Sequence, residues 1–204
     1  MSPSTLIRWS GLSALLGGIS FALFMLTHPW GDIAGPQVAL GGGWVLAHSL
    51  RIAGMLLALF GLVGLYARQM EAAGRMGLIG FILAFIGTFM FGGVGIFVAY
   101  IWPVVAANAP AFTEADGPFF SRPPLILVLM DGSLTLGYIL FGWASIRAAI
   151  LSCWSAWLLI VGVLLFSAPT PPFAPTPWIV HVVGGVLFGG GLAGLGYTLW
   201  ATYS

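Results

Sequence analysis

Six long apolar runs fill most of this sequence, and they restrict what the chain can fold into. Each run holds about 20 residues or more, which is the length that an α-helix needs to cross about 30 Å of hydrocarbon. The runs predict membrane spans at residues 6–26, 44–66, 76–102, 125–146, 148–168 and 178–200. We therefore expect an all-α, polytopic integral membrane protein that forms one transmembrane domain over residues 1–204. The loop lengths alternate between short and long, which favours six transmembrane helices arranged as three helix hairpins.

Charge is too scarce for a water-facing surface. Only 5% of the residues are Asp, Glu, Lys or Arg, whereas a soluble domain carries about 25%. The mean hydropathy is +1.07, so the lipid bilayer is the expected environment. The net charge of +1 offers no basic patch for nucleic acid. Cys153 is the only cysteine, which excludes an intrachain disulfide and a cysteine-rich metal site.

The arginines predict the orientation in the membrane. If the N-terminus is cytoplasmic, Arg8, Arg68, Arg75 and Arg147 lie on the inner side and only Arg122 lies on the outer side. Cytoplasmic segments of membrane proteins are enriched in basic residues. We expect a multi-pass protein of the cell membrane, in a bacterial inner membrane, with both termini cytoplasmic.

Five chemically active side chains are expected in the outer half of the membrane. His48 and Arg51 are three residues apart in the second run, so they share one helix face. Helix rise places them about 6 and about 10 Å from the outer end, and places Asp131 at about 9 Å in the fourth run. His28 follows the first run and His181 lies one turn into the sixth. Charges within a span are costly and usually mark a site or have a partner.

Arg51 and Asp131 have three interpretations. Their similar depth favours a buried ion pair between the second and fourth spans. Alternatively, they line a cavity in which Arg51 holds a carboxylate or a phosphate. In the third interpretation Arg51 extends its side chain to the membrane surface.

The histidines also have several interpretations. Each one can simply bond a backbone carbonyl or a lipid headgroup near a helix end. As ligands, His28, His48 and His181 are suited to a metal ion such as zinc, copper or iron. His48 and His181 are candidate axial ligands of haem b, with Arg51 near a propionate. The same residues can hydrogen-bond a quinone.

No catalytic residues are predicted. The glycine clusters lack the Gly-Lys-Ser/Thr of a phosphate-binding loop, and no G-x-S-x-G motif occurs. The sequence therefore favours a protein that is not an enzyme. The first hypothesis is an accessory or structural subunit of a larger membrane complex, in which electron transfer is one activity considered, with other membrane subunits as partners. The alternatives are a stand-alone haem-, metal- or quinone-binding protein with an outer-leaflet site, and a transporter of small molecules or lipids.

Three short segments carry a resemblance. RWSGL at residues 8–12, GLVGLYARQ at 61–69 and LGYTLW at 195–200 are similar to segments of uncharacterised bacterial six-span membrane proteins. The resemblance extends over most of the hydrophobic pattern. It implies the fold but no activity.

Overall fold

The computed structural model of the chain describes residues 3–30, 36–114, 117–118, 125–169 and 177–203. These residues are almost entirely helical and contain no β-strand, which confirms the all-α prediction. The elements are α1 (Pro3–Thr27), α2 (Pro36–Ala39), α3 (Trp44–Ile96), the π-helical η1 (Phe97–Ile101), α4 (Trp102–Asn108), the 3₁₀ turn η2 (Pro110–Phe112), α6 (Leu125–Ala148), α7 (Cys153–Phe166) and α8 (Trp178–Thr202).

Four helical stretches of the described chain are long and apolar enough to cross a membrane. They are Ser4–Thr27, Trp44–Asn108, Leu125–Ala148 and Trp178–Thr202. Their outward surfaces expose large apolar side chains such as Leu26, Phe60 and Phe89. Exposure of such side chains to lipid is favourable, whereas their exposure to water costs free energy. The chain is therefore a membrane-embedded helical protein.

Helix α3 folds back on itself at Gly74. This glycine has φ 57° and ψ −156°, a non-helical conformation in the left-handed half of φ space. On either side of it the two halves of α3 run alongside each other in opposite directions. Tyr66 stacks on Phe81 with ring centroids 4.6 Å apart. The Trp44 indole donates a hydrogen bond of 2.8 Å to the carbonyl of Val98.

The third predicted span ended at Trp102, but the helical backbone continues to Asn108. A π-helical segment, in which Trp102 N–H donates to the Phe97 carbonyl, connects α3 to α4. Pro103 then occupies the first turn of α4. Pro103 lacks the N–H that would continue the π-helical pattern to the Val98 carbonyl, and that carbonyl accepts from the Trp44 indole instead, so proline does not end the helix.

Helix α7 is shorter than the fifth predicted span of 148–168. It has 14 residues, from Cys153 to Phe166. The preceding Ala149 has a positive φ of 52°, which ends α6. The Ser152 side chain then accepts a hydrogen bond from the Ser155 N–H and caps α7. A turn thus occupies residues that the apolar pattern had assigned to the span.

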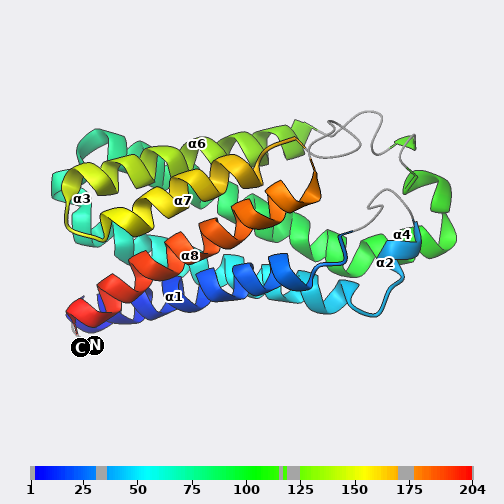
Figure 1. Cartoon of the computed structure of the whole chain (residues 1–204), viewed down its shortest axis with the longest axis horizontal. Helices are drawn as coiled ribbons and strands as arrows, with labels where there is room; N and C mark the ends of the chain where they lie inside the picture. Colours follow the sequence, from blue (N-terminus) through cyan, green and yellow to red (C-terminus); the bar gives the residue numbers. More distant parts are fainter. Residues whose placement is uncertain (1–2, 31–35, 115–116, 119–124, 170–176, 204) are drawn as a thin grey trace.

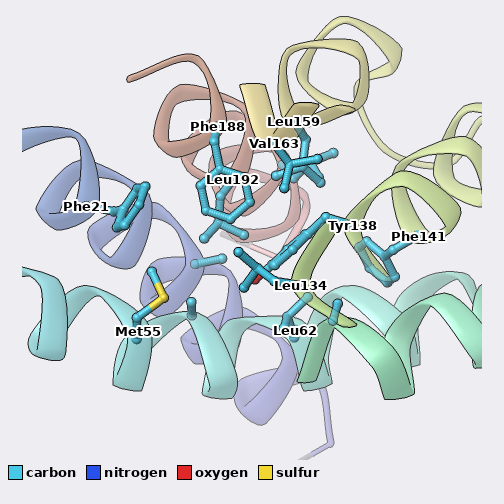
Figure 2. Packing of buried hydrophobic residues seen from close by; sticks show 14 of the residues in the cluster. Phe21, Met55, Leu62, Leu134, Tyr138, Phe141, Leu159, Val163, Phe188 and Leu192 are labelled. Atoms are coloured by element: carbon cyan, nitrogen blue, oxygen red, sulfur yellow. The ribbon is translucent and has the colours of Figure 1, made fainter. Parts of the chain in front are cut away.

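The long helices form an elongated bundle (Figure 1). Helix α1 packs against α3 and α8, α7 packs against α8 and α6, and α6 packs against α3. The buried core contains Phe21, Tyr138 and Phe188, shown with their neighbours in Figure 2. Small residues let the helices approach closely: a Cβ at Gly137 would collide with the backbone of Ala84.

The two termini lie together at one end of the bundle, and α2 and α4 lie at the opposite end (Figure 1). We call this opposite end the far end. The segment after α1, the start of α3 and the start of α8 all reach it. These segments hold His28, His48 and His181. The fold thus brings to one end of the bundle the three histidines that we expected in one half of the membrane.

Candidate functional site

Arg51 projects from α3 into the interior of the bundle, where its side chain is only 7% exposed. Its guanidinium carbon lies 4.6 Å from the ring centroid of Phe91, on the returning half of α3, and 5.7 Å from that of Phe24 on α1. Both rings attract the cation through their π faces. This contact stabilises the charge in part, but an aromatic face offers no oxygen acceptor.

Two guanidinium atoms of Arg51 lack a hydrogen-bond partner. Nε and Nη2 are both buried, and no described residue accepts from either of them. These two N–H groups form the edge of the guanidinium that binds a carboxylate or phosphate with two parallel hydrogen bonds. A Cβ on Gly95 would lie 3.0 Å from each of the two nitrogens. Gly95 therefore lies directly against this edge, where any larger side chain would crowd the two nitrogens.

The predicted ion pair between Arg51 and Asp131 does not form in the described part of the chain. Asp131 lies in the exposed first turns of α6, where residues 125–132 are all exposed or only half-buried. The same helix face becomes buried only from Leu134 onward. Asp131 instead borders an open pocket with His181 and Ser167. Asp131 itself is exposed, so this part of α6 does not pack against the interior that holds Arg51.

His28 and His48 lie side by side at the far end. Their ring centroids are 4.9 Å apart. The Nδ1 atom of His48 is 2.9 Å from the Trp44 carbonyl, which makes Nδ1 the donor and leaves Nε2 free to accept or to bind a ligand. His28 is buried as well, and its Nδ1 has no partner among the described residues. One interpretation of a histidine near a helix end, a bond to a backbone carbonyl, thus fits His48.

His181 lies in a different environment. Its ring stacks on Phe166 at 4.5 Å and meets the edge of Trp30 at 5.2 Å. The Trp30 ring also contacts His28, at 4.3 Å, and so links the two histidines through an aromatic ring.

The positions of the three histidines can be compared with the predicted metal and haem sites. No group of three His, Cys, Asp or Glu side chains in the described ranges is placed to hold a metal ion, so the structure does not gather His28, His48 and His181 into such a site. His48 and His181, the expected haem ligands, contact different aromatic neighbours. Haem b ligation by this pair stays a prediction.

Some residues of the site gave no signal in the sequence. Phe24, Phe91 and Gly95 belong to runs in which phenylalanine and glycine are common. Their role around Arg51 depends on the reversal of α3 at Gly74, which brings Phe91 and Gly95 back to the level of Arg51. In the sequence, Phe91 and Gly95 are simply a phenylalanine and a glycine four residues apart in the third run, a spacing too common there to predict contact with Arg51.

A second buried polar residue lies nearer the termini. Gln69 is 1% exposed and donates a hydrogen bond of 2.8 Å to the Ser145 hydroxyl, which donates in turn to the Phe141 carbonyl. Its Oε1 atom has no partner in the described chain. This pair joins α3 to α6 inside the bundle.

Comparison of the chain with protein-family models, with curated proteins and with solved structures gave no match, so the functional argument rests on the residues themselves.

Proposed function

We propose that this protein binds an anionic amphiphile inside the membrane, with Arg51 as the residue that holds the anionic headgroup. The observation that supports the proposal is a buried guanidinium whose Nε and Nη2 have no acceptor among the described residues. In the same proposal the chain spans the membrane six times as three helix hairpins, with both termini cytoplasmic.

The ligand is anionic because Arg51 lacks a counter-charge. A buried ion without a partner is destabilising by several kcal/mol, and the nearby rings of Phe24 and Phe91 offset only about 1–2 kcal/mol of this. A carboxylate or phosphate on the Nε and Nη2 edge would supply both the missing charge and the missing hydrogen bonds. His48 lies about one helical turn away on the same face of α3, where its free Nε2 can contact the same headgroup.

The rest of the ligand is apolar because the surroundings of Arg51 are apolar. The rings of Phe24 and Phe91 lie against it, and the ring of Phe21 contacts both, at 5.6 and 6.1 Å. A free inorganic anion would gain nothing from these rings and would first have to leave water. A fatty acid or an acidic phospholipid brings its own apolar part.

The role as an accessory subunit, which the composition favoured, stays a prediction. The exposed apolar side chains along the helices suit lipid and a partner subunit equally. Proteins that remain bound in stoichiometric amounts after extraction in a gentle detergent would support that role.

Thermal unfolding in dodecyl maltoside, followed by tryptophan fluorescence, tests the ligand proposal. Oleate is the carboxylate probe, dioleoyl phosphatidic acid is the phosphate probe, and oleyl alcohol is the uncharged control. We expect at least one anionic probe to raise the Tm of the native protein, and oleyl alcohol to leave it unchanged. Which of the two probes acts identifies the headgroup.

Two substitutions at Arg51 and one matched control make the test specific. Arg51→Leu should abolish the stabilisation, and Arg51→Lys, which keeps the charge but not the two-pronged edge, should weaken it. Arg75→Leu removes an exposed arginine near the turn at Gly74 and should respond as the native protein does. Equal responses to oleate, phosphatidic acid and oleyl alcohol, or an unchanged response in both Arg51 variants, would refute the proposal.

A further inference from the structure

A second pocket lies between the start of α6, the end of α7 and the start of α8. Its volume is about 620 Å³, which is within the range of small-molecule sites. Most of its wall is apolar and includes Val128, Met130 and Phe166, while Asp131, Ser167 and His181 supply the polar groups. Arg51 does not line it, although the wall residue Phe166 contacts Phe91, which lies against Arg51.

Asp131 has no cationic partner in this pocket. No described arginine forms an ion pair with it, and its neighbour is the neutral hydroxyl of Ser167. That hydroxyl accepts a hydrogen bond of 2.6 Å from Thr135, so it is oriented with its own proton free to donate. A carboxylate within an apolar helix needs either a proton or a cation.

Two aromatic rings also line the pocket. Phe166 and His181 are stacked with centroids 4.5 Å apart and 24° between their planes. The face of an aromatic ring attracts a cation, and the attraction strengthens when water is excluded. The Nδ1 atom of His181 is enclosed by protein, so the ring offers the pocket its aromatic surface.

We infer that this pocket binds an amphiphilic primary amine, with the ammonium group between the Asp131 carboxylate and the stacked Phe166 and His181 rings. The ammonium group donates up to three hydrogen bonds, and the Asp131 carboxylate is a suitable acceptor. The alkyl part of the amine lies along Val128 and Met130. Gly132 leaves the space beside Asp131 open, because a Cβ there would meet no atom within 4 Å.

Isothermal titration calorimetry of the full chain in dodecyl maltoside at pH 7 tests this inference. The probe is n-octylamine, and n-octanol is the uncharged probe of the same length. Native protein should bind the amine more tightly than the alcohol. Asp131→Asn should weaken amine binding roughly tenfold or more, the loss expected for one charge-assisted hydrogen bond, and should leave octanol binding unchanged. Glu71→Gln, at an exposed carboxylate far from the pocket, is the matched control and should bind as the native protein does.

A second variant keeps the test decisive if Asp131→Asn fails to fold. Gly132→Leu fills the open space from a position where the new side chain meets no neighbour, so it should fold and lose binding of the amine. Native protein that binds amine and alcohol equally well, or binds neither, would overturn the inference, as would full amine binding by both variants. Arg51→Leu should leave amine binding intact, so the two proposals fail independently.

Discussion

The guanidinium of Arg51 and the ring of Phe91 face each other at 4.6 Å, although 40 residues separate them in the sequence. Both belong to α3, and the reversal at Gly74 brings them together. Gly95, one turn beyond Phe91, also lies against the guanidinium, since a Cβ on it would be 3.0 Å from Nε and from Nη2. The environment of the buried charge is thus set largely within one helical hairpin.

Gly95→Ala should damage this arrangement. The added methyl group would lie 3.0 Å from both Nε and Nη2 of Arg51, closer than ordinary carbon contacts. We expect a loss of about 1–3 kcal/mol in the free energy of unfolding, as for other overpacked sites, together with a weaker response to oleate. Reversible unfolding in mixed micelles measures the first effect. Gly93→Ala is the matched control, since a Cβ at Gly93 meets nothing within 4 Å, and equal stability of the two variants would contradict this prediction.

Substitution of Arg51 and Asp131 together should show no coupling. The two side chains form no ion pair, so the effects of Arg51→Leu and Asp131→Leu on the free energy of unfolding should add within about 0.5 kcal/mol. A double-mutant cycle measured in the same micelles checks this. A double variant that loses much less stability than the sum of the two single variants would show that Arg51 and Asp131 do form an ion pair.

Gly74→Ala should destabilise the reversal of α3. The φ of 57° lies in a region that costs an L-residue about 1–2 kcal/mol. No neighbour obstructs a Cβ at this position, so the expected loss of about 1 kcal/mol comes from the backbone alone. Gly74→Asn should lose about as much, because asparagine tolerates the αL region, whereas the ψ of −156° at Gly74 lies in a region that is essentially restricted to glycine. An alanine variant as stable as the native protein would argue against the observed turn.

Labelling of Cys153 tests the proposed orientation. This residue is the only cysteine, and its thiol is free and exposed at the start of α7. With cytoplasmic termini, a membrane-impermeant maleimide should label Cys153 in inside-out vesicles and not in right-side-out vesicles. Asn108→Cys, combined with Cys153→Ser, places an exposed thiol at the far end and should give the reverse pattern. Labelling of both positions from the same side would disprove the orientation.

The helical character of the apolar runs and the grouping of the three histidines could be predicted, because both depend on the length and order of the runs. His28, His48 and His181 do lie at one end of the bundle, since helix rise determines their position along the axis. The packing partners of Arg51 could not be predicted in this way. They depend on how each helix is rotated and on which neighbours it has, and apolar runs rich in glycine and phenylalanine carry almost no periodic signal about either.

Asp131 illustrates the difference. Its expected depth matches that of Arg51, and depth alone favoured an ion pair. The structure leaves the first turns of α6 uncovered, so Asp131 lies beside Ser167 and His181 at the pocket between α6, α7 and α8. The neighbours of the Asp131 carboxylate therefore depend on where the adjacent helices begin and end. The sequence of α6 alone does not contain this information.

The reversal at Gly74 also has a consequence for biogenesis. Only one residue breaks the helix between the two halves of α3, so closing the loop between them costs little entropy. The halves can pair as soon as the second one leaves the ribosome, before α6 has been synthesised. In that order of events Arg51 would enter the bilayer with the Phe91 ring already against its charge.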